Sequence, residues 1–492
     1  MTLKTFFACV IIALSVYAAQ AQFPIKNLNV VIFTADDLGA DETGVGAFGA
    51  KIKGITPNLD KVAKAGVRFY NAHVNSAICV PSRGVLGTGK YGFNSHQHGF
   101  FFAPDSIPTL MESFQKKGYK AGILGKVAHS SVKASTQWDY VVDYEDLGSG
   151  RSPSKYYEKT KTFIESCGKE NKPFYFMINS HDPHRPFQSP DGELLKDAEW
   201  PSNMYKPGEV FVPGFLPDLP EVRKEISNYY NSVRRLDDTF GKVMQAIKDA
   251  GAEKNTLLIF FSDNGISMPF AKANSYFKST RTPLFIYMPA TIKPREDNEH
   301  VVSTIDLFPT IMDMIGGEKP AGLNGSSFLP LLQGKEQKGK DAVFTQIDYL
   351  SNNKATPMRC IEDKFFAYIF NPWSDGKTIY RNANEGETFK AMIEKGKTDS
   401  ATQARVNLFR YRTPEEFYDL KNDPNCLHNL VNDQAYTNKL QQYRSKMKEW
   451  LKKYNDPLLQ VLNLSNKPQE MRQLMDEVYA GELKPGKGVK GD

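Results

Sequence analysis

Two pairs of polar side chains could together bind a divalent cation. Asp36-Asp37 follows the apolar run Asn29 to Thr34, and Asp263-Asn264 follows the apolar run Leu257 to Ser262. If both runs are strands of one sheet, the pairs lie at the strand ends, where open α/β sheets place their sites. Their hard oxygen ligands suit Ca²⁺ or Mg²⁺ better than Zn²⁺. Each pair alone has a simpler explanation, since Asp-Asp can cap a helix and Asp-Asn-Gly is a common turn.

A cysteine in a short, specific motif could supply a nucleophile. The segment reads Cys79-Val80-Pro81-Ser82-Arg83 and continues to Thr88-Gly89-Lys90. A lone cysteine is more often a buried, unmodified thiol, so the motif is a hypothesis until other features agree with it. The segment resembles the signature of the type I sulfatases, in which a separate maturing enzyme oxidises the cysteine to formylglycine (3-oxoalanine), an aldehyde.

The resemblance continues in order through about the first 330 residues, and more weakly beyond them. Within the family the sequence is most similar to heparan N-sulfatase (sulfamidase) and to bacterial polysaccharide sulfatases. One segment, Gly125 to His129, instead resembles iduronate-2-sulfatase. The matching strings are Asp36-Asp37, Thr56-Pro57-Asn58-Leu59-Asp60, Gly125-Lys126, His181-Asp182-Pro183-His184-Arg185, Val210 to Pro217, Ser262-Asp263-Asn264-Gly265-Ile266 and Asp306-Leu307-Phe308-Pro309-Thr310.

The resemblance implies roles for individual residues. Ca²⁺ is expected to bind Asp36, Asp37, Asp263, Asn264 and an oxygen of the formylglycine formed at Cys79. One hydroxyl of the hydrated aldehyde would attack sulfur, with the cation helping to deprotonate it. Arg83 is expected to hydrogen-bond formylglycine, and Lys126 and Lys272 are expected to neutralise the sulfuryl oxygens. His181, with Lys272, is expected to protonate the leaving oxygen, and His129 is the expected base of the second step.

Five further residues are weaker candidates for binding the sugar: His96, His98, His184, Arg185 and Arg281. The expected substrate is a sulfated polysaccharide or its oligosaccharides, with O-sulfate esters preferred, for example in an algal polymer such as ulvan. Lys272 supports O-sulfate, because sulfamidase has Arg at the matching position. The alternatives are N-sulfoglucosamine hydrolysis and a non-catalytic binder of sulfated glycans. Phosphodiester hydrolysis is a more distant alternative, because it would be expected to use a Ser or Thr nucleophile and a His-rich set of zinc ligands, which this sequence lacks.

Apolar runs that alternate with amphipathic helical stretches indicate which elements position these residues. This alternation predicts an α/β fold with a large, mostly parallel sheet flanked by helices, as in the alkaline-phosphatase-like sulfatase fold that the resemblance implies. A polar run, Lys335 to Lys340, marks a boundary. We expect a catalytic domain over 22–340 and a smaller α+β domain over 341–492, with a terminal helix near Asn438 to Lys453 and a tail rich in Lys and Gly.

The N-terminus predicts export. Lys4 precedes the apolar run Phe6 to Ala18, and Ala19-Gln20-Ala21 follows, so residues 1–21 resemble a cleavable signal peptide. The run is too short for a comfortable membrane span, and stable membrane insertion is not expected. We expect a periplasmic or secreted protein, in which a Cys360–Cys426 disulfide is one option and the pairing of Cys167 is open.

Composition fits this interpretation without deciding it. The 492 residues are 40% hydrophobic, enough for a large core, and carry a formal net charge of +6. A mild positive charge favours an anionic partner, although it is also ordinary for a solvated surface. The sequence has no basic recognition helix or aromatic RNA-binding pattern, so a nucleic-acid partner is not expected.

Overall fold

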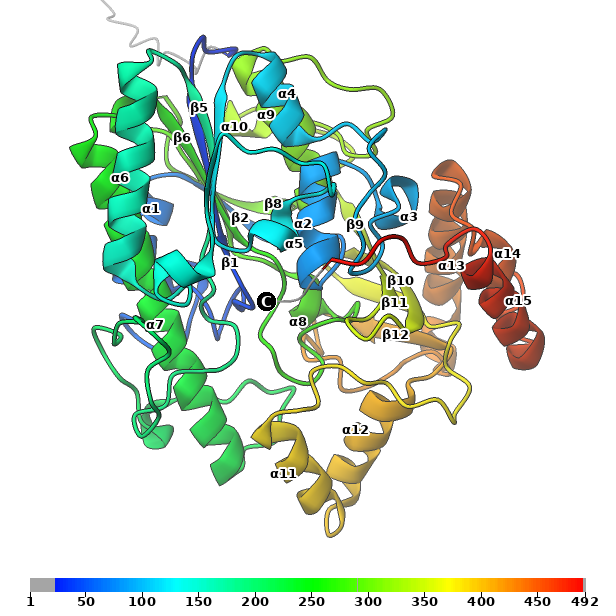
Figure 1. The fold of residues 1–492 in the computed structure, drawn as a ribbon. Helices are drawn as coiled ribbons and strands as arrows, with labels where there is room; N and C mark the ends of the chain where they lie inside the picture. The colour runs from blue at the N-terminus through cyan, green and yellow to red at the C-terminus, as the bar shows by residue number, and fades with distance from the viewer. Residues whose placement is uncertain (1–22, 290, 490–492) are drawn as a thin grey trace, which may run out of the picture.

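A mixed sheet of eight strands forms the centre of the molecule (Figure 1). The computed structural model describes residues 23–289 and 291–489, so the predicted signal peptide lies outside the described residues. The strand order is β4-β3-β5-β1-β6-β7-β2-β8. Every pairing is parallel except those of β7 with β2 and β6. The strands are β1 (Asn29–Ala35), β2 (Val67–His73), β3 (Lys120–Leu124), β4 (Tyr140–Val142), β5 (Phe174–Asn179), β6 (Thr256–Ser262), β7 (Leu284–Tyr287) and β8 (Arg295–Ser303).

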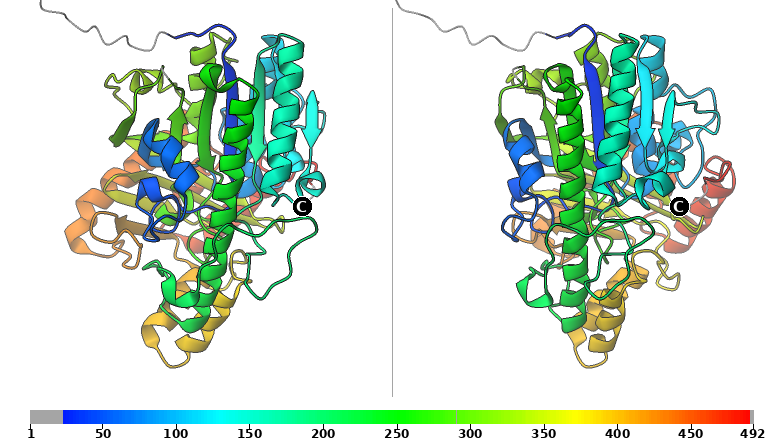
Figure 2. Two further views of the ribbon diagram at one scale, coloured as in Figure 1. Left: turned by 90° about the vertical axis from the view of Figure 1, so that its left-hand side faces the viewer. Right: turned by 60° about the vertical axis from the view of Figure 1, so that its left-hand side comes forward.

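Helices cover both faces of this sheet, as Figures 1 and 2 show. Val31 and Phe33 of β1 pack in the core that includes α6 (Pro153–Lys169) and α7 (Pro220–Asp249), with α1 (Pro57–Lys64) beside them. Val30 and Ile32 point to the other face, into the core with α4 (Leu110–Lys116), α9 (Leu307–Ile315) and α10 (Leu329–Leu332). Alternate side chains of a strand point to opposite faces, so the four consecutive residues Val30 to Phe33 are all apolar. The predicted α/β architecture is confirmed.

The chain after the polar run at 335–340 forms a smaller antiparallel sheet with helices around it (Figure 1). Its strand order is β12-β11-β10-β9. The strands are β9 (Ala342–Tyr349), β10 (Ala355–Asp363), β11 (Phe366–Phe370) and β12 (Glu415–Asp419). The helices are α11 (Glu387–Gly396), α12 (Ser400–Tyr411), α13 (Thr437–Lys453), α14 (Leu459–Leu462) and α15 (Pro468–Ala480). The predicted boundary at 340/341 lies between β8 and β9; as a domain division it stays a prediction.

Short elements complete the fold. The remaining α-helices are α2 (Cys79–Thr88), α3 (Gly92–Ser95), α5 (Val127–Ser130) and α8 (Phe277–Thr280). The 3₁₀ turns are η1 (Gly46–Phe48), η2 (Tyr144–Leu147), η3 (Pro207–Glu209), η4 (Glu253–Asn255), η5 (Thr304–Asp306) and η6 (Gln434–Tyr436). The segment after α15 returns to the larger domain, where Phe102 N donates to Lys487 O and Val489 N donates to Phe100 O.

The four cysteines among the described residues are unpaired thiols. Cys79, Cys167, Cys360 and Cys426 are all free and buried. The optional Cys360–Cys426 disulfide is therefore not formed in this structure. Among the described residues, no helix is both long and apolar enough to cross a bilayer.

Candidate active site

Three buried carboxylates and an amide converge at the ends of β1 and β6. The strands pair in parallel with Ala35 opposite Ser262, so the residues that follow leave the sheet at the same level. Asp37 N donates to Asp263 Oδ1 at 3.2 Å, and Asn264 Nδ2 donates to Asp37 Oδ1 at 2.7 Å. All four side chains, including that of Asp36, are fully buried. The predicted meeting of the two pairs is present in the structure.

Cys79 lies beside these carboxylates. It is the first residue of α2, and its Sγ is 3.7 Å from Asp36 Oδ1 and 4.0 Å from Asn264 Oδ1. Burial, despite the opposing effect of the Lys272 charge, raises the pKa of the Cys79 thiol well above its ordinary value. A thiol with a raised pKa is a poor nucleophile at neutral pH. The surroundings of Cys79 therefore do not activate the unmodified thiol.

Three buried cations face the three carboxylates. Arg83, one turn along α2 from Cys79, donates through Nε and Nη2 to Asp263 Oδ2 at 3.1 and 2.8 Å. Lys126 Nζ is 2.9 Å from Asp36 Oδ2, and Lys272 Nζ is 2.6 Å from Asp37 Oδ1. The formal charges of the six groups cancel. The cluster can consequently accept a divalent cation and a sulfate dianion together without gaining net charge.

The pKa values of the carboxylates show how tightly they are crowded. Burial would raise the pKa of Asp36, but the charges of Lys126, His184 and Arg83 outweigh it and hold that pKa well below the ordinary value. For Asp263, burial and the neighbouring Asp36 charge raise the pKa to about 7. Repulsion between neighbouring carboxylates is relieved by a proton or by a bound cation.

The two histidines of the loop after β5 take different positions. His184 is 33% exposed; its Nδ1 is 2.7 Å from Arg185 O, and its Nε2 is 3.9 Å from Asp37 Oδ2. Because a carbonyl can only accept, Nδ1 carries the proton and Nε2 faces the carboxylate. His181 is buried, and its Nε2 accepts from Lys126 N at 3.2 Å. Burial and the Lys126 charge hold its pKa well below the ordinary value, so His181 is a neutral acceptor.

His129 is placed by α5, three residues after Lys126. Its ring is buried and lies perpendicular to the ring of Phe100 at 5.8 Å between centroids. Lys126 begins this turn in the left-handed conformation, with φ of 50°. This backbone turns the chain sharply, so that Lys126 reaches Asp36. A role for His129 in the reaction stays a prediction.

The candidates for sugar binding are dispersed. Arg185 Nη1 pairs with Glu225 at 2.5 Å, next to the loop of His184. Arg281 pairs with Asp41 at 3.1 Å and lines a separate hollow of about 260 Å³ that contains His73 and Lys278. His98 is 3.0 Å from Leu483 O and packs on Tyr349 and Phe101, whereas His96 is exposed at the end of α3. Arg281 and His98 are thus held by Asp41 and by Leu483, outside the carboxylate cluster.

Two residues that support the site were missed in the sequence. Asn179 ends β5; its Oδ1 accepts from Arg83 Nη1 at 2.6 Å, and its Nδ2 donates to Gly125 O at 2.9 Å. Asp182 accepts from Arg235 through both carboxylate oxygens at 2.7 and 3.0 Å. Asn179 could have been found, since it follows a buried strand as Asp36 does. The partner of Asp182 lies 53 residues away on α7, and no local pattern indicates that pairing.

The site has the donors for a divalent cation. One ligand atom each from Asp36, Asp37, Cys79 and His184 lies within 4.8 Å of the others. Oxygen donors dominate once Cys79 carries an oxygen, as the sequence comparison with sulfatases implies. Asp263 and Asn264 adjoin this group through their bonds to Asp37. His184 was not predicted as a neighbour of the metal, and an imidazole is a ligand that suits softer ions better than Ca²⁺.

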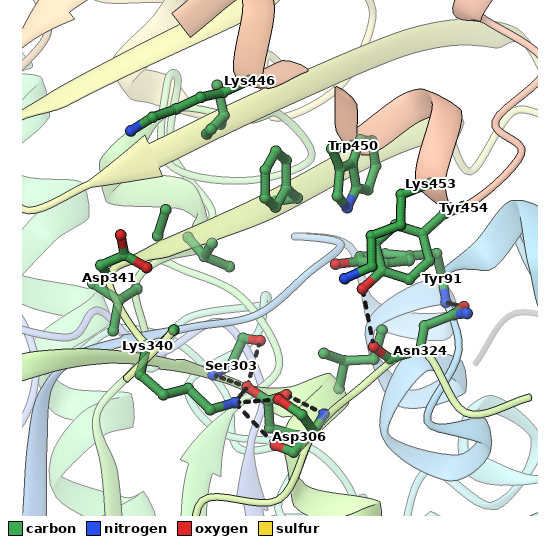
Figure 3. A pocket seen from close by; sticks show the side chains of 18 of the residues that line it. Tyr91, Ser303, Asp306, Asn324, Lys340, Asp341, Lys446, Trp450, Lys453 and Tyr454 are labelled. Carbon is green, nitrogen blue, oxygen red and sulfur yellow. Dashed lines mark hydrogen bonds and ion pairs between the residues drawn. The ribbon is translucent and has the colours of Figure 1, made fainter. Parts of the chain in front are cut away.

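A second hollow lies away from these residues (Figure 3). It is lined by α13, by β9 and by the segment Ser303 to Asp306. It has a volume of about 370 Å³, and its walls include Tyr91, Trp450 and Tyr454. Lys340 Nζ forms an ion pair with Asp306 Oδ2 at 2.8 Å beside this hollow (Figure 3). None of the predicted site residues lines it, so we do not place the reaction there.

Two family models match the chain. The model described as Sulfatase matches residues 28–317, and the model described as N-sulphoglucosamine sulphohydrolase, C-terminal, matches residues 267–408. Together they cover the larger sheet and strands β9 to β11 of the smaller one. The C-terminal model begins at residue 267, just before Lys272, and continues into the smaller sheet. Its match therefore includes both one edge of the carboxylate cluster and part of that sheet.

Curated relatives and solved structures agree with these matches. Human N-sulphoglucosamine sulphohydrolase is 28% identical over 87% of this chain and 91% of its own length. An ulvan-active sulfatase of Formosa agariphila is 29% identical over 87% and 81%. A 2-O GAG sulfatase superposes with a TM-score of 0.63 at 20% identity, covering 87% of this chain and 93% of its own. Phosphonate monoester hydrolase of Agrobacterium radiobacter gives 0.60 at 20% identity, covering 87% and 96%.

Proposed function

We propose that this chain, which belongs to the sulfatase family and is a sulfuric ester hydrolase, is an exported enzyme that depends on formylglycine and Ca²⁺. We propose further that it releases O-sulfate from a sulfated polysaccharide or its oligosaccharides. The observation that carries this proposal is the position of Cys79 beside Asp36 and Asn264 in a buried cluster of matched charge. Members of the family generally use formylglycine and a divalent metal.

When present, formylglycine supplies the nucleophilic oxygen and the cation supplies positive charge for it and for the sulfuryl group. The chain's own residues prepare this site. Arg83 fixes Asp263 and Asn179, and so holds the acidic strand ends in place. Its guanidinium is fully buried, which keeps water from competing for these bonds.

Lys126 and Lys272 would bind the sulfuryl oxygens. Each Nζ is bonded to a carboxylate, Asp36 or Asp37, that the cation would also contact. With the carboxylate charge taken up by a cation, each ammonium can turn its donors to the anionic substrate. Fixed donors of this kind stabilise developing charge without reorganisation of the site.

We assign the proton for the leaving oxygen to His184 in place of His181. His184 is anchored at Nδ1 on Arg185 O, and its Nε2 faces the carboxylates from a partly exposed position. His181 is enclosed, with Nε2 occupied by the Lys126 N–H group. An acid must reach the oxygen that it protonates and must carry the proton on the atom that faces it. Burial and the Lys272 charge lower the pKa of His184, and the form that acts is the imidazolium, with a second proton on Nε2. His129 remains the proposed base of the second step.

The substrate is proposed from the relatives and from Lys272. The similarity to ulvan-active sulfatases of Formosa agariphila supports an O-sulfated algal polysaccharide. N-sulfoglucosamine is the second candidate, supported by the human relative and by the C-terminal model that matches residues 267–408. A non-catalytic binder of sulfated glycans would keep Cys79 as a thiol.

Export and maturation complete the proposal. The residues 1–21 support cleavage near Ala21 and a periplasmic or secreted protein. A formylglycine-generating or other sulfatase-maturing enzyme of the host is the required partner for Cys79.

Two measurements on one preparation test the proposal. The mass of the peptide containing Cys79 shows whether sulfur has been replaced by oxygen with loss of two hydrogens. Sulfate release is then followed on ulvan, carrageenan and heparan oligosaccharides, with an N-sulfated one included. Release from O-sulfated sugars supports the leading substrate; release from N-sulfoglucosamine alone favours the second. A thiol at Cys79 in a host that matures sulfatases would refute the enzyme mechanism.

A further inference from the structure

A buried arginine from the smaller domain lies in a cage of aromatic rings next to the loop that carries Lys272. Arg412 follows α12 and is 5% exposed. Its Cζ lies 4.8 to 5.4 Å from the centroids of four rings, those of Phe270, Tyr276, Tyr380 and Phe409. Its Nη1 donates to Tyr276 OH at 3.2 Å, whereas Nε and Nη2 make no hydrogen bond within the described residues. Ring faces therefore replace much of the hydration of this cation.

The cage reaches the Lys272 loop from both sides in sequence. Phe270, two residues before Lys272, packs on Phe409 at 5.0 Å and lies 3.6 Å from the guanidinium carbon of Arg405. Tyr380 OH donates to the carbonyl of Ala273, the residue after Lys272. The residues that hold Phe270 and Ala273, on either side of Lys272, thus come from the segment 380–412, much later in the chain.

The loop needs such anchors because its backbone is strained. Phe270 has φ of 68° and Ala273 has φ of 58°, both in the left-handed region that side chains with a Cβ rarely adopt. Strained residues persist only where the surroundings fix them, and they concentrate at functional sites. Between these two positions, the Lys272 ammonium is held 2.6 Å from Asp37 Oδ1.

We propose that Arg412 is a positioning residue for the sulfatase reaction, which holds Phe270 and Tyr380 so that Lys272 stays aimed at Asp37 and the sulfuryl group. The smaller domain then contributes to turnover as well as to packing. This inference rests on the proposed role of Lys272. A displacement of about 1 Å in a catalytic group can reduce the rate about a hundredfold, so loss of the cage should be visible in kcat.

A double-mutant cycle separates positioning from general stability. Arg412→Met, which keeps the bulk but removes the charge, should lower kcat about ten- to hundredfold with little change in KM. In a Lys272→Met background the same substitution should cause little further loss. Arg412→Lys should recover part of the rate, and Arg410→Met, on the same helix over the Phe389 ring, is the matched control that should keep full activity. An equal loss from Arg412→Met in both backgrounds overturns the inference.

Amine labelling tests the geometry without relying on sulfatase activity. In the wild type, Lys272 and Lys126 are both buried on carboxylates and should react slowly with an acylating reagent. Arg412→Met should speed the labelling of Lys272 several-fold and leave Lys126 unchanged. If both lysines or neither becomes faster, positioning is refuted. If Arg412→Met does not fold, Tyr380→Phe, which removes only the bond to Ala273 O, replaces it with the same expectations. A folded wild type whose Cys79 has been converted but that releases no sulfate would refute the proposed function, while labelling would still decide the geometry.

Discussion

Cys79 Sγ lies 3.7 Å from Asp36 Oδ1, although the two residues are 43 positions apart in the chain. The contact arises because β1 delivers Asp36 to the edge of the sheet and α2 begins at that same edge with Cys79. Lys126 and Lys272 neutralise the neighbouring carboxylates from two further loops.

Removing one carboxylate should abolish turnover without unfolding the protein. Asp36→Asn and Asp263→Asn keep the side-chain shape but delete charge that the cation and the lysines need. We expect sulfate release to fall at least about a hundredfold, because fixed charge at the reacting group is lost. Sulfate release and thermal unfolding measured together test this. Normal turnover in both variants contradicts the assigned cluster.

A divalent cation should be needed for activity and should stabilise the fold. Chelation is expected to stop sulfate release, and Ca²⁺ should restore it better than Mg²⁺, Mn²⁺ or Zn²⁺. At a concentration of 100 times its Kd, the cation should raise the free energy of unfolding by about 2.7 kcal/mol. Calorimetric titration of the chelated protein gives the affinities. Tighter Zn²⁺ binding that is lost in His184→Ala would show that His184 is a metal ligand and that Ca²⁺ is the wrong ion.

The two histidines of the loop after β5 should respond differently to the leaving group. If His184 protonates the leaving oxygen, His184→Ala should lower kcat about 10²- to 10⁴-fold for sugar sulfates. The loss should be much smaller for an aryl sulfate whose phenolate leaves without protonation. His181→Ala should show no such dependence on the leaving group. The opposite pattern would return the role to His181.

The buried pair of His73 and Glu362 should give a stability maximum in mildly acidic solution. The atoms His73 Nδ1 and Glu362 Oε1 are 3.3 Å apart. Burial and the Arg281 charge lower the pKa of His73 to about 3, and burial raises the pKa of Glu362 well above 4.5. The folded pair therefore keeps one proton on the carboxyl group over a wide range of pH.

The direction in which stability changes with pH follows from the number of protons that the His73–Glu362 pair binds in the folded and unfolded states. Above pH 6.5 the unfolded pair binds none, so stability falls as pH rises toward the folded pKa of Glu362. Below pH 4.5 the unfolded pair binds two, so stability falls again until the pKa of about 3 is reached. Each slope is at most about 1.4 kcal/mol per pH unit. Glu362→Gln should remove this pair's contribution and make the fall in stability between pH 6 and 9 shallower, which denaturant unfolding measures; an unchanged slope contradicts the neutral pair.

Much of the site could be predicted because its residues follow buried strands or lie in one short motif. The pairs Asp36-Asp37 and Asp263-Asn264 are of this kind, and parallel strands must bring such residues together. The different surroundings of His181 and His184 could not be predicted, since the loop from His181 to Pro186 has no periodic pattern that fixes the direction of its side chains. Arg281 and His98 contact Asp41 and Leu483 through tertiary packing that the sequence did not indicate, and their role in binding the sugar stays a prediction. The cage around Arg412 needs residues from 270 to 412, a separation that no local pattern indicates.

The central claim is that formylglycine at position 79 hydrolyses sulfate esters with a divalent cation. Sulfate release from O-sulfated oligosaccharides by Ca²⁺-loaded wild type, beside Cys79→Ala prepared in the same maturing host, tests it most directly. We predict steady release by the wild type and none above background by Cys79→Ala. Equal release by both proteins, or no release by a wild type whose Cys79 has been converted, would contradict the account.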